Sequence, residues 1–255
     1  MIFPKTSTLS IIPVAMIVSL CLLEVRPLPA SELYRIIDSP TAGLVSKGRF
    51  GVDLRLFPNG GIAAAIQAGA LQRLTIGLAF GGEQIIGDQS IDWSPRVETG
   101  IRYRIVEESA AFPAAVVGYE TQGYGTHKNK RYQIKSKGLF VVLSKNYFSA
   151  FGQFGVHGGL NLSRENQDGD EDMSAWLGVD KSINDELVLV SEYDFAFNDN
   201  SHLALGDGEG YWNAGIRWSV IPELTLGFYL KNLSNNGESG TDMSRELSLL
   251  YTEGF

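Results

Sequence analysis

The chain has 255 residues, of which 44% are hydrophobic and 20% charged, with 29 glycines and one cysteine. Its 21 basic and 29 acidic residues give a net charge of -8, which argues against a nucleic-acid-binding protein, since such proteins usually carry a basic patch or stripe. A single cysteine excludes a disulfide scaffold and a cysteine-rich metal site.

The first thirty residues have the layout of a secretory signal peptide. Lys5 precedes an apolar run from Leu9 to Leu23, and a Pro-Leu-Pro-Ala stretch ends at Ala30. The run contains Pro13 and is shorter than the roughly 20 residues of a membrane-spanning helix. We therefore expect residues 1–30 to be removed together with the only cysteine; an uncleaved anchor is the alternative. Residues 31–47 would form a periplasmic N-terminal segment.

After Ala30, apolar and polar residues alternate with a period of two, which is typical of strands with two different faces. The clearest example is residues 224–231, where leucine and phenylalanine alternate with threonine, glycine, tyrosine and lysine. In chain order we expect strands near 48–57, 60–70, 72–81, 96–106, 113–122, 132–144, 147–163, 173–181, 186–198, 210–220, 223–233 and 244–255.

The expected connections alternate between long and short, and only the first hairpin, around Asn59, breaks this order. Bacterial outer-membrane barrels combine an even number of antiparallel strands with short periplasmic turns and longer outer loops. We therefore predict an all-β protein: a transmembrane antiparallel barrel of about twelve strands over residues 48–255. It would lie in the bacterial outer membrane with both termini in the periplasm. The mean hydropathy of -0.02 fits a polar lumen inside an apolar exterior.

The last residues support the same location. Apolar and aromatic residues at alternate positions lead through Tyr251 to a terminal Phe255, although Glu253 departs from the pattern. This arrangement resembles the C-terminal signal of bacterial outer-membrane proteins. The resemblance implies the barrel-assembly machinery as a partner, with outer-membrane lipid and lipopolysaccharide around the barrel.

The polar phase of the strands contains charges of both signs. Opposite charges could pair and fill a narrow barrel, because a buried unpaired charge is costly, or they could line a conduit for a solute. The candidate lumen-lining residues are Arg49, Asp53, Arg55, Glu98, Arg102, Arg104, Glu120, His157, Glu192, Asp194, Arg217 and Lys231.

Motifs for a metal or a cofactor are weak. Asp168, Asp170 and Asp172 have the spacing of the first ligands of a calcium loop, but Met173 and Val179 occupy the positions of the glycine and the last glutamate. We interpret this acidic stretch as a solvated outer loop, and we expect no metal and no cofactor.

Enzyme motifs are weak as well. The chain lacks G-x-S-x-G and H-E-x-x-H sequences. A twelve-stranded barrel is similar to the outer-membrane phospholipase, but His157 falls on the polar phase, and His127 and His202 fall in expected loops. The sequence identifies no serine partner for these histidines, so we expect no catalytic residue.

Several segments resemble the YjbH-like group of bacterial outer-membrane proteins, which is linked with exopolysaccharide production. The segments that carry the resemblance are Ser39–Leu44, Phe57–Gly61, Gly81–Gly87, Phe112–Ala114, Gln122–Gly125, Ile134–Gly138, Glu192–Asp194 and Tyr211–Trp218. The resemblance implies a barrel in an envelope-polysaccharide context, with polysaccharide export components as partners.

The leading hypothesis is thus a non-enzymatic outer-membrane protein that is a narrow pore or an accessory to envelope polysaccharide export. The alternatives are a plugged structural barrel that displays its loops and a membrane-embedded phospholipid hydrolase. No nucleic-acid partner is expected.

Overall fold

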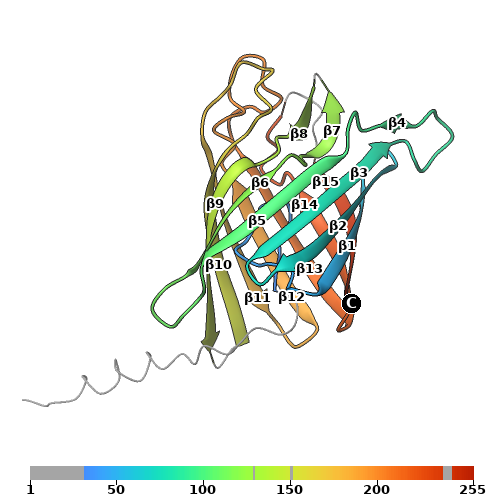
Figure 1. Ribbon diagram of the computed structural model, residues 1–255. Helices are drawn as coiled ribbons and strands as arrows, with labels where there is room; N and C mark the ends of the chain where they lie inside the picture. The colour runs from blue at the N-terminus through green and yellow to red at the C-terminus, as the bar shows by residue number, and fades with distance from the viewer. Residues whose placement is uncertain (1–31, 129, 150–151, 238–242) are drawn as a thin grey trace, which may run out of the picture.

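The structure of the protein is a computed structural model that describes residues 32–128, 130–149, 152–237 and 243–255. The expected signal peptide, with Cys21, lies outside the described residues. Within these ranges, twelve long antiparallel strands close into one barrel, because the first, β1, pairs with the last, β15 (Figure 1). No helix among the described residues is long and apolar enough to span a membrane.

The barrel strands follow one another around the ring in chain order. They are β1 (Arg49–Phe57), β2 (Gly61–Leu71), β3 (Leu74–Glu83), β5 (Glu98–Val106), β6 (Ala114–Glu120), β9 (Gly138–Ser149), β10 (Gly152–Leu162), β11 (Ser174–Ser182), β12 (Leu187–Asp194), β13 (Tyr211–Ile221), β14 (Leu224–Lys231) and β15 (Ser244–Gly254). Three short strands lie in the long connections: β4 (Asp92–Trp93), β7 (Tyr124–Lys128) and β8 (Arg131–Ile134).

The alternation along each strand separates two environments. In β5, the side chains of Glu98 and Arg102 are buried, whereas Ile101 and Tyr103, on either side of Arg102, are about half exposed. Exposed apolar side chains recur in this phase around the ring, from Ile66 and Leu78 to Leu177 and Phe228. The exterior is thus apolar and the interior charged, which is the arrangement of a barrel that is surrounded by lipid.

Both ends of the barrel sheet lie at the same rim, where the Phe255 amide donates to the Gly48 carbonyl oxygen at 2.9 Å. The long connections 84–97, 121–137, 163–173 and 195–210 lie at the opposite rim, together with residues 232–237 and the short turn 58–60. The loop asymmetry of the sequence is therefore present, with the expected exception at the first hairpin.

One expected strand was misplaced. The sequence predicted a strand over 132–144 and a turn at Lys145 and Asn146, but β9 begins at Gly138 and continues to Ser149. Gly138 has a φ of 59°, which interrupts an extended strand, and residues 131–134 form part of the β7–β8 hairpin instead. Lys145 and Asn146 pair in the ladder with β10, so this hairpin turns beyond Ser149.

A second boundary was also wrong. The strand expected over 186–198 ends at Asp194. The Phe195 amide still donates to Ala175 in β11, but Ala196 has a φ of 48° and turns the chain inward.

Candidate functional site

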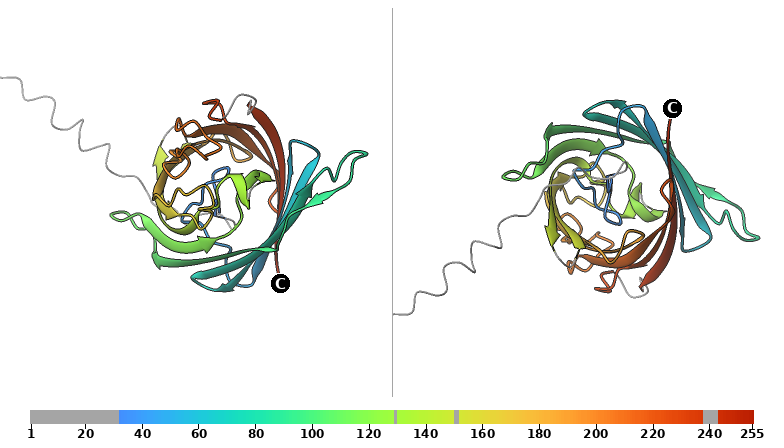
Figure 2. Two further views of the ribbon diagram at one scale, coloured as in Figure 1. Left: turned by 90° about the horizontal axis from the view of Figure 1, so that it is seen from above. Right: turned by 90° about the horizontal axis from the view of Figure 1, so that it is seen from below.

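Residues 34–44 run through the inside of the barrel. Figure 2 shows this segment, in blue, within the ring of strands. Ile36, Ile37 and Ser39 have no exposed surface. The two isoleucines pack against Val190 and Tyr229, while Ala42 and Leu44 join an apolar cluster around Val116 and Trp176. From the sequence we expected residues 31–47 to form a periplasmic N-terminal segment, and their pattern contains no sign of a place inside the barrel. We call residues 34–44 the inner segment.

The strands leave room for the inner segment at a glycine. A Cβ atom on Gly178 of β11 would lie 2.5 Å from Cδ1 of Ile36, which is closer than two carbon atoms can approach. Gly178 lies in the inward phase of its strand, between Trp176 and Asp180. Its lack of a side chain therefore allows the segment to contact the barrel wall.

Asp38 lies at the deepest part of the inner segment and binds two cations. Its carboxylate accepts a hydrogen bond from Arg55 at 2.6 Å and forms an ion pair with Lys231. Glu246 lies on the far side of both cations, 3.5 Å from Arg55 and from Lys231. All four side chains are buried, so the charges of three strands are balanced only when the inner segment is present.

The backbone of the inner segment is held by Glu192 of β12. Its two carboxylate oxygens accept hydrogen bonds from the amides of Ile37, Asp38 and Ser39, at 3.1, 2.9 and 2.9 Å. Asn213 donates a further bond to the same carboxylate at 2.8 Å. Three successive N–H groups that converge on one point form an anion-binding nest, and here the anion is a side chain of the barrel wall.

Arginines of β5 hold the other side of the segment. Arg102 donates to the carbonyl oxygen of Tyr34 at 2.6 Å and forms an ion pair with Glu120. Arg104 donates to the carbonyl oxygen of Ala42 at 2.8 Å and forms an ion pair with Glu32. The inner segment is thus fixed by charged hydrogen bonds on opposite walls of the barrel.

The twelve candidate lumen residues can now be placed. Nine of them are buried, and Arg49, Asp53 and Arg217 are half-buried. Seven of the twelve bind the inner segment directly: Arg55, Arg102, Arg104, Glu120, Glu192, Arg217 and Lys231. Asp194 binds Lys137, and Glu98 accepts a hydrogen bond from Tyr132 at 3.1 Å. Of the two arrangements considered from the sequence, the geometry resembles the paired network, but many of the partners come from the inner segment.

His157 has a serine partner that the sequence did not reveal. Its Nδ1 lies 2.8 Å from Oγ of Ser144, and its Nε2 lies 2.7 Å from Oδ1 of Asp180. The Ala42 amide donates to the same serine oxygen at 2.8 Å. A neutral imidazole with its proton on Nε2 satisfies the whole chain, from Ala42 through Ser144 and His157 to Asp180. Because the inner segment covers the buried serine, this chain anchors the segment and presents no free nucleophile.

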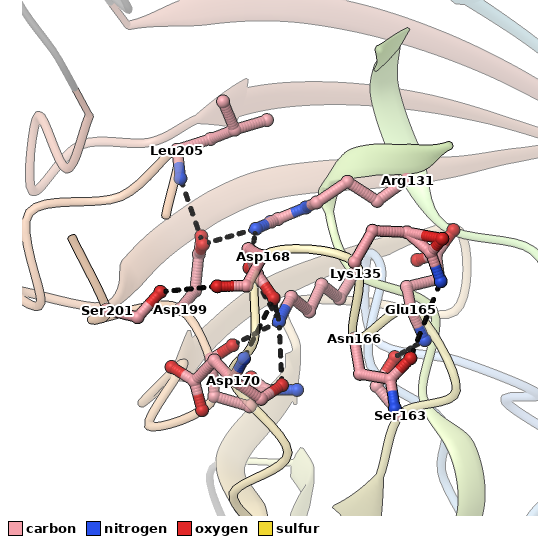
Figure 3. Close-up of polar contacts among 12 residues, drawn as sticks. Arg131, Lys135, Ser163, Glu165, Asn166, Asp168, Asp170, Asp199, Ser201 and Leu205 are labelled. Carbon is pink, nitrogen blue, oxygen red and sulfur yellow. Dashed lines mark hydrogen bonds and ion pairs between the residues drawn. The ribbon is translucent and has the colours of Figure 1, made fainter. Parts of the chain in front are cut away.

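At the rim of long loops, the β7–β8 hairpin and the loops 163–173 and 195–210 contact one another, and we call them the lid. Figure 3 shows their polar contacts. Arg131 at the start of β8 binds Asp199 at 2.7 Å and also pairs with Asp168. Lys135 donates to Asp168 at 2.9 Å and to the carbonyl oxygen of Asn198 at 2.5 Å. Two cations of one loop are therefore surrounded by carboxylates from two others.

This lid corrects the expectation of a solvated acidic loop. Asp168 and Asp170 are buried, at 6% and 8% exposure. Asp168 faces Arg131 and Lys135, so its charge is already neutralised and it is not positioned as a calcium ligand. Among the residues that the structure describes, no cluster of histidine, aspartate or glutamate could hold a metal ion.

Glu165 connects the acidic loop to the hairpin. It accepts hydrogen bonds from the amides of Tyr132 and Ser136, at 3.2 and 2.7 Å. Burial raises the pKa of Glu165 above its ordinary value, and the two amide donors only partly oppose this effect.

Between the inner segment and β1, β2, β3 and β5 there remains a cavity of about 240 Å³, which we call the chamber. It exists because the inward positions of β2 and β3 carry small residues: Ala63, Ala65, Gly77, Ala79 and Gly81. Its wall toward the barrel axis contains Tyr34 and Arg35 of the inner segment and Tyr124 of the hairpin. Towards the rim of short turns, Val45 and Thr75 hydrogen-bond to each other, at 3.0 and 3.3 Å, and close the inner segment against β3.

Comparison with solved structures gives the same architecture. The KdgM porin matches with a TM-score of 0.50 and 7% identity, over 80% of this chain and 98% of that chain. The KdgM porin in complex with disordered oligogalacturonate matches with a TM-score of 0.53 and 8% identity, over the same shares. The NanC porin covers 81% of this chain and 99% of its own at 11% identity, with a TM-score of 0.43.

The chain is an outer-membrane β-barrel. Its closed antiparallel ring, its apolar exterior and its similarity in fold to KdgM support a location in the bacterial outer membrane. No protein-family model matches the sequence. No curated protein matches it either. The likeness to KdgM therefore concerns the fold alone.

Proposed function

We propose that this protein is a non-enzymatic outer-membrane pore whose passage is narrowed by its own inner segment. The observation that carries this proposal is the chamber, an open volume inside a closed barrel, with small side chains of β2 and β3 on one side and larger polar and aromatic side chains around the rest. A space that protein atoms do not fill is unusual for a barrel that serves only as a packed structure, since interiors are normally filled to crystal-like density.

The chamber lies among polar and aromatic side chains, which suits a small polar solute such as a saccharide fragment. The solved KdgM complex contains oligogalacturonate, so a barrel of this architecture can admit a saccharide. We extend this to the context implied by the YjbH-like resemblance, in which the protein would be an accessory to envelope polysaccharide export. Genes for polysaccharide synthesis or export beside its own would support that context, and their absence would count against it.

A plugged structural barrel is the second candidate, and the tight hold on the inner segment favours it. Asp38 alone binds Arg55 of β1, Glu192 of β12 and Lys231 of β14, so one residue ties the inner segment to three strands. The two candidates differ in one respect: a pore conducts with the segment in place, and a plug does not.

Planar-bilayer recording separates them. The refolded chain would be compared with a variant in which residues 34–44 are replaced by glycine and serine at equal length, and heat-modifiable migration on a gel would confirm the folded barrel of each. We expect small steps from the wild type and steps several times larger from the variant. A silent wild type beside a conducting variant would establish a plug. Silence from both folded proteins would overturn the pore.

A further inference from the structure

The lining of the chamber contains more negative than positive side chains. Its carboxylates are Asp53, Glu83, Asp92, Glu98, Glu120 and Glu246, and its guanidinium groups are those of Arg35 and Arg55. The ion pairs of the described residues account for only part of this excess. Arg35 pairs with Glu120, Arg96 with Glu98, and Arg55 with Glu246.

Three carboxylates of the chamber form no ion pair in the part of the chain that the structure describes. Asp53 and Asp92 form no ion pair, and Glu83 has only a hydrogen bond from Asn59 at 3.3 Å. Carboxylates in a partly enclosed space with low-dielectric walls strongly attract positive charge. The chamber is therefore suited to a cationic solute.

Side chains of the chamber lining also contain polar atoms without a hydrogen-bond partner. Four buried side-chain atoms of the chamber lining have no such partner among the described residues: Oδ1 of Asp53, Oε2 of Glu246, Nε of Arg35 and the hydroxyl of Tyr124. Glu246 is only 5% exposed, and its nearest cations are 3.5 Å away. Buried polar groups are normally satisfied by protein or by water, so these side chains have hydrogen-bonding capacity that the protein itself does not use.

The requirements of these atoms restrict the chemistry of that partner. The two carboxylate oxygens need donors, which an ammonium group supplies with three N–H bonds. The arginine Nε–H needs an acceptor, and the tyrosine hydroxyl can donate or accept a hydrogen bond. Hydroxyl groups on the same solute would serve both. A solute with an amine and several hydroxyl groups carries donors and acceptors of both kinds.

The walls suit such a solute as well. One side is the flat surface of alanines and glycines from β2 and β3, which can lie against a ring. The other side contains the rings of Tyr34, Tyr124 and Tyr132. Aromatic faces attract cations, and the Tyr124 ring already has the guanidinium of Arg55 4.5 Å from its centre.

We propose that the chamber is a binding site for a small polyhydroxylated amine, of which an amino sugar is the simplest example. This rests on the proposed function in that the chamber is the passage. The same carboxylates would repel a uronate, so the preferred solute differs in charge from the oligogalacturonate bound in the KdgM complex.

The test is calorimetric titration of the full refolded chain in detergent with three sugars of equal size and different charge: glucosamine, glucose and glucuronate. The pH would be mildly acidic, so that the amine is protonated and exposed carboxylates remain ionised. We expect glucosamine to bind best and glucuronate to bind worst. Equal affinity for glucosamine and glucose, or preference for glucuronate, would overturn the proposal, and absence of binding would show that the chamber holds only water.

Asp53→Asn is the decisive variant, because Asp53 has no ion pair to break and its loss should leave the network intact. We expect it to weaken glucosamine binding about tenfold or more, the effect of one charged hydrogen bond, and to leave glucose unchanged. Asp185→Asn is the matched control, because Asp185 lies outside the chamber in the short turn between β11 and β12. An Asp53→Asn variant that binds glucosamine like the wild type would contradict the assignment.

The outcome does not depend on conduction, because binding is measured in detergent. Binding without any conductance step would overturn the proposed pore and leave the site in place. Conductance without binding would overturn the binding site and leave the proposed pore in place.

Discussion

Glu192 shows how one side chain can position a segment that has no regular secondary structure. The inner segment forms no ladder with the barrel, so its amides need other acceptors. Glu192 supplies one acceptor group for three successive amides, and Asn213 keeps its carboxylate in place. Charged hydrogen bonds of this kind are stronger than neutral ones, especially where water is excluded.

Glu192→Ala should therefore destabilise the folded protein strongly. Three buried amides would lose their acceptor, and each hydrogen bond to a charged group contributes about 1.5–3 kcal/mol, so we expect a loss of at least about 3 kcal/mol. Urea unfolding in detergent micelles measures the change. Glu192→Gln retains one carbonyl oxygen as an acceptor, so its free energy of unfolding should lie between those of the wild type and Glu192→Ala.

The matched control is Glu186→Ala, at an exposed position in the turn before the same strand. It should change the free energy of unfolding by no more than about 0.5 kcal/mol. Equal effects of Glu186→Ala and Glu192→Ala would show that the inner segment contributes nothing to stability.

At the scale of elements, the β7–β8 hairpin and the loops 163–173 and 195–210 behave as one lid. They are distant in sequence and share a core of charge: Arg131 and Lys135 from the hairpin connection, Asp168 and Asp199 from the two loops. Tyr211 adds its hydroxyl to Asp199 at 2.8 Å. Because these groups are buried, none of the loops can leave without exposing an unpaired charge on the others.

Arg131→Met should open this lid. The variant keeps an apolar stem of similar length but leaves two buried carboxylates with one cation, Lys135, and breaking a buried pair in this way costs about 3–5 kcal/mol. We expect rapid cleavage of the 163–173 loop by a protease added to reconstituted vesicles, while the barrel stays protected.

Lys128→Met is the control for charge, since Lys128 is exposed on the same hairpin. Its loops should resist the protease as the wild type does. Resistance of Arg131→Met would mean that packing, and not the ion pairs, holds the lid closed.

At the scale of the whole molecule, the charges face inward and the apolar side chains face outward, the reverse of a water-soluble protein. The ring closes through β1 and β15, so no strand edge is left unpaired in lipid. The inner segment and the lid then fill most of the interior, and the small residues of β2 and β3 leave the chamber on one side.

If lipid surrounds the apolar exterior, the free-energy cost of a charged side chain there depends on its depth in the bilayer. Leu177, in the middle of β11, is 55% exposed, and Ile183, in the turn after it, is 57% exposed. We expect Leu177→Arg to reduce the free energy of folding into vesicles by about 2–4 kcal/mol and Ile183→Arg by only about 0–1 kcal/mol. Equal costs at the two equally exposed positions would argue against a bilayer around β11.

The barrel itself was predictable from the sequence because its signals are local. Alternation with a period of two reports two faces of a strand within a few residues, and loop lengths report on which rim each connection lies. The errors occurred where a local pattern was overruled. The 131–137 region has the polarity of a strand, but its cations are used by the lid, and Gly138 interrupts the chain just before β9.

By itself, the sequence determined the strand periodicity, the number of strands and the polarity of the two barrel faces. Only the tertiary structure decided what the inward charges bind. Asp38 and Lys231 are 193 residues apart, and Ser144, His157 and Asp180 lie on three different strands. No local pattern encodes such pairings, because they depend on the register of the closed ring and on a segment that returns into its lumen. The chamber depends on the tertiary structure for the same reason, because it is the space that remains between the inner segment and the strands once these pairs have formed.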